Sequence, residues 1–101
     1  YQVVNLPEGK IITDKIDINK VVNELSKYSE EGAGALTIFI GFVKGEVDGK
    51  KVNELDYSVY EPYTSEKLNE IANSELDNDI YDIRIYHRSG NLTVGEPTVY
   101  I

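Results

Sequence analysis

The longest apolar run in this chain is Ala35-Leu36-Thr37-Ile38-Phe39-Ile40-Gly41-Phe42-Val43, and the architecture around it depends on how that run is buried. Its β-branched and aromatic residues favour a strand. Apolar side chains fill almost every position instead of alternate ones, a pattern typical of a strand covered on both faces. We therefore predict a buried central strand at residues 35–43. Gly41 inside it indicates a bulge or the close approach of another backbone or a ligand.

The residues before this run predict a short strand and an amphipathic helix. Ile11 and Ile12 lie at the centre of a β-like segment at residues 10–13. Apolar residues then recur at the spacing of one helix face, and this helix is expected to end near Ser29. Either Asp17 or Asn19 is a suitable cap for its first turn. The apolar stripe consists of Ile18, Val21, Val22, Leu25 and Tyr28.

The residues after the run predict a hairpin, a second helix and two further strands. Asp48-Gly49 is a strong signal for a tight hairpin turn, and residues 52–60 alternate as the next strand. Thr64 or Ser65 is expected to cap a second helix. Residues 80–87 form a third strand, residues 88–95 a loop or tight hairpin, and residues 98–101 the opening of a fourth strand.

The element order β-α-β-β-α-β-β predicts an α+β fold with two helices and a mainly antiparallel sheet. Its 101 residues, without a visible linker or repeat, fit a single domain at residues 1–101. The sequence begins with Tyr1, contains no Met and ends at Ile101 within an apolar run. We therefore expect the domain to continue beyond Ile101.

Composition excludes several classes of function. A net charge of −8 repels nucleic acid, and no basic run offsets it. The absence of cysteine excludes disulfides, thiolate metal sites and a cysteine nucleophile. No apolar run approaches the roughly 20 residues of a membrane span. We expect a cytoplasmic protein that binds neither nucleic acid nor membrane and holds no metal or cofactor.

A few residues are candidates for chemistry at strand ends. His87 and Arg88 end the third strand, where an imidazole can act as acid, base or anion donor and a guanidinium can hold a phosphate. Lys44 is a cation at the end of the central strand. For all three the alternative is a purely structural or solvated role. That alternative is favoured, because a single residue is a weak signal of function. We expect Phe39 to be a core residue and not a ligand contact. Spacing alone identifies no enzyme motif.

Three segments in the right order resemble the large subunit family of molybdopterin synthase, MoaE. Residues 34–44, Gly-Ala-Leu-Thr-Ile-Phe-Ile-Gly-Phe-Val-Lys, resemble the family's Gly-Ala to Phe-x-Gly-x-Val-Arg strand. Residues 55–63 are similar to the family's strand that leads into a turn and helix. Residues 85–96, Ile-Tyr-His-Arg-Ser-Gly-Asn-Leu-Thr-Val-Gly-Glu, resemble its His-Arg-x-Gly-x-Leu-x-x-Gly-Asp/Glu motif and are the most specific of the three.

The resemblance implies an α/β-hammerhead-like fold and a sulfurtransferase activity. It implies transfer of sulfur from the thiocarboxylate at the Gly-Gly C-terminus of a small ubiquitin-like subunit, MoaD, to cyclic pyranopterin monophosphate, which builds the molybdopterin dithiolene. A homodimer that binds two small subunits, and so forms a heterotetramer, is the implied assembly. The alternative is a non-catalytic MoaE-like module for binding or dimerisation.

Carried over by motif, the resemblance assigns His87, Arg88, Lys44 and Phe39 to binding of the pterin substrate. Lys44 stands where the family has arginine, which keeps the charge but loses paired N–H donors for phosphate. The family's catalytic lysines follow the strand that begins at Thr98, so the resemblance places them beyond Ile101.

Overall fold

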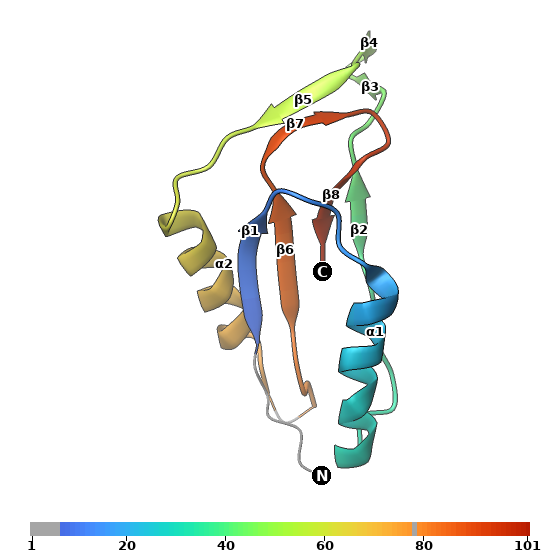
Figure 1. Ribbon diagram of the computed structural model, residues 1–101, viewed down its shortest axis with the longest axis vertical. Helices are drawn as coiled ribbons and strands as arrows, with labels where there is room; N and C mark the ends of the chain where they lie inside the picture. Colours follow the sequence, from blue (N-terminus) through green and yellow to red (C-terminus); the bar gives the residue numbers. More distant parts are fainter. Residues whose placement is uncertain (1–6, 78) are drawn as a thin grey trace.

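The computed structural model describes residues 7–77 and 79–101, and within them it confirms the α+β class (Figure 1). Its helices are α1 (Ile18–Ser26), the short 3₁₀ helix η1 (Lys27–Glu31) and α2 (Tyr63–Ser74). Its strands are β1 (Glu8–Ile12), β2 (Ile40–Phe42), β3 (Glu46–Val47), β4 (Lys50–Lys51), β5 (Glu54–Tyr57), β6 (Arg84–Arg88), β7 (Gly90–Thr93) and β8 (Pro97–Tyr100).

A four-stranded sheet in the order β1-β6-β8-β2 forms the body of the molecule. Strand β1 runs parallel to β6, whereas β8 is antiparallel to both β6 and β2, so the sheet is mixed but mainly antiparallel. Helix α2 packs against β1 and β6, and α1 lies on the opposite face (Figure 1). A second sheet of β5 and β7 and the β3–β4 hairpin extend from one end, which gives a long molecule of 50 × 26 × 22 Å.

The predicted central position of the apolar run is wrong. Only Ile40–Phe42 form a strand, and β2 lies at the edge of the sheet with β8 as its single neighbour among the described strands. The side chains of Phe39 and Phe42 are each 58% exposed. A continuous apolar run indicates that the segment tends to be covered, but it does not indicate which element covers it.

The chain after β2 folds partly as predicted. Asp48 and Gly49 have φ angles of 53° and 75°, which confirms the tight hairpin turn between β3 and β4. The predicted strand at 52–60 is confined to β5. The segment 88–95, predicted as a loop or tight hairpin, contains β7, which pairs with β5 from Glu54↔Thr93 to Tyr57↔Gly90. This pairing joins distant segments, so local sequence patterns do not reveal it.

Near the start of each helix, a side-chain carboxylate accepts a hydrogen bond from a backbone N–H group. Asp17 caps α1 as predicted, because its carboxylate accepts from the Lys20 N–H at 3.3 Å. Helix α2 begins at Tyr63, earlier than predicted, and neither Thr64 nor Ser65 is its cap. Glu61 supplies the acceptor instead, at 2.8 Å from the Ser65 N–H.

Close packing of β1 on α2 depends on a glycine. A Cβ atom at Gly9 would lie 2.2 Å from the backbone C and O atoms of Leu68 in α2. Buried apolar residues elsewhere are few and include several tyrosines, as expected for a small domain. They are Tyr28, Val43, Ala72, Tyr86, Leu92 and Tyr100.

Candidate functional site

Residues of β6, β8 and β2 lie in one row across the sheet, on the face against which α2 packs. His87 on β6 pairs with Val99 on β8, and Val99 pairs with Gly41 on β2. Directly paired residues project to the same face, so His87, Val99 and the bare Gly41 position lie side by side. Phe39, two residues before Gly41, projects to this face too. The row contains one imidazole, one glycine gap and one exposed aromatic ring.

His87 is held in a defined orientation. Its Nδ1 atom lies 2.8 Å from the carbonyl oxygen of Arg88, and a carbonyl only accepts, so Nδ1 carries the hydrogen. In the neutral ring, Nε2 is then left with its lone pair as an acceptor. The ring of Tyr57, from β5, meets the imidazole edge-on at 5.3 Å between centroids. This arrangement suits His87 for accepting a proton through Nε2.

Arg88 faces a different environment from His87, because successive strand residues project to opposite faces. Its side chain is buried, with 8% exposed, and its guanidinium donates to three acceptors in two segments of the chain. These are the carbonyl of Thr13 at 3.1 Å, the carbonyl of Pro97 at 3.2 Å and the carboxylate of Glu96 at 3.3 Å. The donors are therefore committed inside the protein.

Glu96 completes the surroundings of Arg88. Its carboxylate accepts from the Thr93 N–H at 2.7 Å and from the Thr93 hydroxyl at 3.0 Å. These two bonds, with a smaller effect of Arg88, hold the pKa of Glu96 below its usual value. Glu96 thus fixes both the β7–β8 turn and the guanidinium.

Phe39 and Lys44 lie on the far side of β8 from His87. Lys44 is exposed just beyond β2, and no ion pair is recorded for it among the described residues. Phe39 exchanges two backbone hydrogen bonds with Ile101, at 2.6 and 2.9 Å, which ties it to the end of β8. The His87 side chain bonds the Arg88 carbonyl, and in the described part of the chain no hydrogen bond or ion pair is recorded from the side chain of Lys44 or Phe39 to either residue.

Sequence reasoning did not find Tyr57 and Glu96 as supporting residues. Tyr57 lies in the strand predicted at residues 52–60 and in the second resembling segment, but its contact with His87 depends on the β5–β7 pairing. Glu96 is in the third resembling segment, but nothing local indicated that it bonds Arg88.

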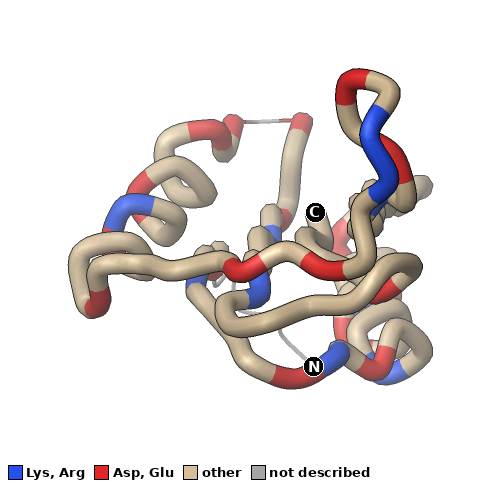
Figure 2. Tube along the Cα trace, turned by 90° about the horizontal axis from the view of Figure 1, so that it is seen from above, with Lys and Arg blue, Asp and Glu red and all other residues tan. Residues whose placement is uncertain are grey.

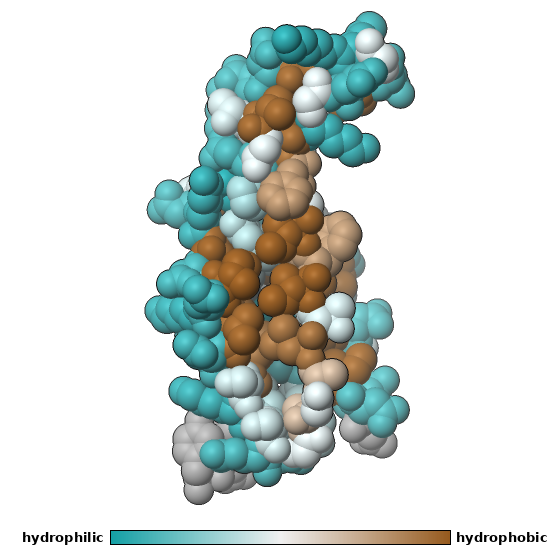
Figure 3. All heavy atoms as spheres, turned by 90° about the vertical axis from the view of Figure 1, so that its right-hand side faces the viewer, coloured by the Kyte–Doolittle hydropathy of each residue, from teal (hydrophilic) through white to brown (hydrophobic). Residues whose placement is uncertain are grey.

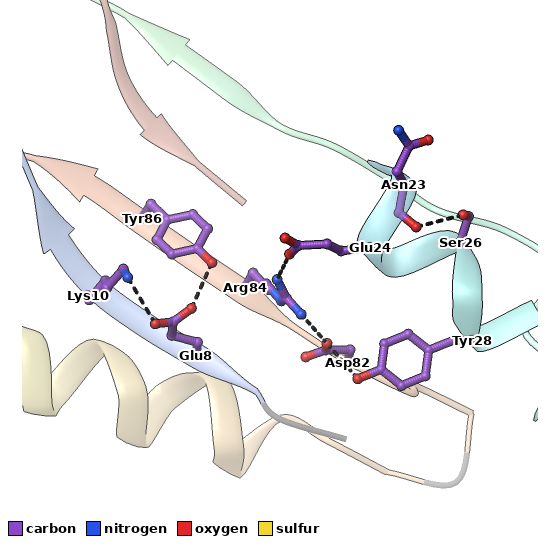
Figure 4. Close-up of polar contacts among 9 residues, drawn as sticks. All are labelled: Glu8, Lys10, Asn23, Glu24, Ser26, Tyr28, Asp82, Arg84 and Tyr86. Atoms are coloured by element: carbon purple, nitrogen blue, oxygen red, sulfur yellow. Dashed lines mark hydrogen bonds and ion pairs between the residues drawn. The ribbon is translucent and has the colours of Figure 1, made fainter. Parts of the chain in front are cut away.

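The opposite face of the sheet carries a polar network (Figure 4). The Tyr86 hydroxyl donates to the Glu8 carboxylate at 2.8 Å, and Lys10 pairs with its other oxygen at 3.1 Å. Burial opposes ionisation of Glu8, but these contacts outweigh it and lower its pKa. Burial, together with the bond to Glu8, raises the pKa of Tyr86 to about 12.

A second part of this network joins β6 to α1. Arg84 pairs with Glu24 at 2.7 Å and with Asp82 at 3.4 Å, and Asp82 also accepts from the Tyr28 hydroxyl at 2.9 Å (Figure 4). Burial lowers the pKa of Arg84, but the two carboxylates prevail and raise it. The network borders a groove of about 1060 Å³ between α1 and residues 32–39, whose lining is mostly apolar. Phe39 lines this groove, whereas His87, Arg88 and Lys44 do not.

The described residues also constrain what else can bind. Within residues 7–77 and 79–101 there is no group of three or more His, Asp or Glu side chains that could hold a metal ion. The helices in that part of the chain are too short and too polar to cross a membrane. Figure 2 shows acidic residues spread along the trace with short basic stretches between them.

Comparison with known proteins identifies relatives along nearly the whole chain. The family model described as MoaE protein matches residues 11–101. A molybdopterin synthase catalytic subunit of Dictyostelium discoideum is 34% identical over 93 residues, which cover 85% of this chain and 59% of that protein. The Pyrococcus abyssi protein of the same name is 38% identical over 72% of this chain and 50% of its own length. The Drosophila melanogaster protein of that name is 36% identical over 91% of this chain and 25% of its own.

Proposed function

The chain belongs to the MoaE family, and from this membership we propose that it acts as the large, catalytic subunit of molybdopterin synthase. The observation that carries the proposal is the match through residues 11–101, which includes His87, Arg88 and the turn they lead into. The chain spans 59% of the Dictyostelium relative and 25% of the fly relative. The activity of those whole proteins is therefore a proposal for this chain.

The proposed reaction transfers sulfur from the C-terminal thiocarboxylate of a small ubiquitin-like subunit with a Gly-Gly tail to cyclic pyranopterin monophosphate. Each transfer forms a carbon–sulfur bond on the pterin side chain and releases the tail as a carboxylate, whose new oxygen comes from water. The proposed assembly is a cytoplasmic heterotetramer, in which a homodimer of this subunit binds two small subunits.

Within this chain we assign four residues to the pterin-binding side of the site. Lys44 is an exposed cation for the cyclic phosphate, and Phe39 is an exposed ring that can cover the pterin. His87 presents Nε2 as an acceptor for a substrate proton. Arg88 acts as a positioning residue, because its donors hold Thr13, Glu96 and Pro97 while its carbonyl fixes the His87 ring.

The second candidate is a non-catalytic MoaE-like binding module. The observation in its favour is that the guanidinium of Arg88 is buried and donates to Thr13, Glu96 and Pro97, so the candidate residues do not converge on one anion. A module of this kind would bind the small subunit without sulfur transfer.

Substitution of Lys44 tests the assignment of the phosphate contact. In the full-length protein with its thiocarboxylated partner, Lys44→Ala is expected to raise the KM for the cyclic pterin monophosphate on the order of 10- to 100-fold, since a hydrogen bond to a charged group contributes about 1.5–3 kcal/mol. The matched control is Lys27→Ala, at an exposed lysine of η1. Equal KM values for the two variants would remove Lys44 from the site, and a wild-type protein that binds the partner but forms no dithiolene would favour the binding module.

A further inference from the structure

Tyr57 reaches His87 from the second sheet. It is the last residue of β5, and its strand partner is Gly90 on β7. Its ring lies 5.3 Å from the imidazole of His87 between centroids, with 65° between the two planes. Both side chains are half-buried. The contact therefore links the β5–β7 sheet to the four-stranded sheet at the residue that the candidate site depends on.

The β5–β7 sheet fixes the position of Tyr57. Leu55 lies on the same face two residues earlier and pairs with Leu92, which is only 2% exposed, so Tyr57 projects from the covered face. A Cβ atom at Gly90 would meet nothing within 4 Å, which shows that the Tyr57 ring does not lie over its own strand partner. The ring extends toward β6 instead. A residue that orients another must itself be held in place, and Tyr57 meets that condition.

His87 needs more than one contact to keep its ring in one orientation. The bond between Nδ1 and the Arg88 carbonyl, at 2.8 Å, is a single contact with the next residue of the strand. The paired residues on the neighbouring strands, Ile11 and Val99, have apolar side chains that offer the imidazole no polar partner. An aromatic ring set edge-on against the imidazole restricts its rotation. The two contacts together leave Nε2 as the ring nitrogen available to a substrate.

General apolar packing does not account for this contact. Apolar side chains gather on the side of the molecule where α1 and β2 lie (Figure 3). Neither Tyr57 nor His87 lines the groove beside α1. Within the described ranges no hydrogen bond is recorded for the Tyr57 hydroxyl, so its ring is the part that acts on His87.

We propose that Tyr57 is a positioning residue for His87, whose ring keeps the imidazole in the orientation that presents Nε2 to the substrate. The inference rests on the proposed function, because it explains how His87 is made ready to accept a proton during sulfur transfer. Tyr57 acts through His87 and is not assigned to the reacting atoms. Its loss reduces the fraction of molecules with a correctly placed imidazole, which lowers kcat.

The first test observes the imidazole without the reaction. Nitrogen NMR of the isotope-labelled full-length protein, at mildly alkaline pH where an ordinary imidazole is neutral, shows which ring nitrogen carries the hydrogen. The His87 signals are identified by their loss in His87→Gln. The wild type and Tyr57→Phe, which keeps the ring, are expected to carry the hydrogen on Nδ1. Tyr57→Leu is expected to show a mixture of both forms, because the imidazole can then rotate away from the Arg88 carbonyl.

The matched control is Tyr60→Leu, the same substitution at a side chain that is 87% exposed, and it should leave the His87 signals unchanged. Circular dichroism of each variant checks that the fold is retained. A wild type with the hydrogen on Nε2 overturns the proposal without any variant. So does Tyr57→Leu with wild-type nitrogen signals. A mixture in Tyr57→Phe as well would assign the effect to the hydroxyl and overturn the role of the ring.

The second test measures sulfur transfer with the thiocarboxylated partner. Tyr57→Leu is expected to lower kcat on the order of 3- to 10-fold and to leave the KM for the cyclic pterin monophosphate within about twofold, since an aromatic pair contributes modestly. Tyr57→Phe is expected to retain the wild-type rate. Equal kcat values for Tyr57→Leu and the wild type would overturn the role of Tyr57 in the reaction. If the NMR result is as expected but the wild type transfers no sulfur, the ring contact stands and the proposed function alone fails.

Discussion

Arg88 ties the residue that follows β1 to the turn between β7 and β8. Its guanidinium bonds the carbonyl that follows β1, the turn after β7 and the first residue of β8. The guanidinium is buried and a buried charge without partners carries a free-energy cost, so its bonds to these acceptors stabilise the junction where the two sheets meet. The side chain of Arg88 therefore stabilises the fold. Its backbone carbonyl also fixes the orientation of the neighbouring His87 ring.

Replacing Arg88 with lysine is expected to reduce the free energy of unfolding by about 2–4 kcal/mol. Lysine keeps the charge but cannot reach Thr13, Glu96 and Pro97 together, so part-buried hydrogen bonds of the guanidinium are lost. Urea denaturation followed by circular dichroism measures the change. Lys44→Ala, at an exposed position, should alter stability by less than about 0.5 kcal/mol. Equal stabilities for the Arg88→Lys variant and the wild type would show that the guanidinium bonds are not stabilising.

Tyr86 makes stability sensitive to alkaline pH. Its pKa is raised to about 12, above its ordinary value in the unfolded chain, because burial and the Glu8 carboxylate both oppose ionisation. A group with a raised folded-state pKa contributes stability that is complete below the unfolded pKa of about 10 and is lost as pH rises toward 12. The free energy of unfolding should therefore fall between pH 10 and pH 12, and Tyr86→Phe should remove much of that slope. An unchanged slope in the variant would assign the alkaline loss to other groups.

The contact between β1 and α2 is the tightest packing between elements. Gly9 lies against the backbone of Leu68, which cannot move without displacing the helix, and the neighbouring N–H groups of β1 are bonded by Asn69 and Ser65. The sequence predicted β1 and α2 separately, from short-range patterns, but not their contact. An isolated glycine in a strand is the only local signal of such an approach.

Gly9→Ala is expected to destabilise the protein by about 2–3 kcal/mol, because the added methyl group would lie 2.2 Å from backbone atoms of α2. Gly34→Ala is the matched control, since a Cβ atom there meets nothing within 4 Å. Thermal or urea unfolding of the pair measures the difference. If the two alanine variants proved equally stable, β1 and α2 would not pack at the distance described.

Elements with strong local signals could be predicted, and elements that depend on distant partners could not. The α1 stripe with its Asp17 cap and the Asp48-Gly49 turn follow from local chemistry. Strand β7 was missed, and β2 was wrongly placed in the centre, because strand order is set by pairing between remote segments. The candidate site shows the same division. Motifs identified His87 and Arg88, but alternation along β6 separates their side chains.

At the scale of the whole molecule, the long shape leaves much of the sheet uncovered. One face holds the row from His87 to Gly41, the other borders the groove beside α1, and β2 ends the sheet with an open edge. Phe39 connects the first two, since its ring lies near the bare Gly41 position and the residue also lines the groove.

The central claim is sulfur transfer, and the mass of the small partner subunit measures it most directly. The full-length protein is mixed with a thiocarboxylated ubiquitin-like subunit and cyclic pyranopterin monophosphate, and the partner's intact mass is followed with time. The account predicts that the thiocarboxylate mass is replaced by the carboxylate mass only when protein and pterin are both present, with dithiolene product in proportion. Binding of the partner without this pterin-dependent conversion would contradict the catalytic role.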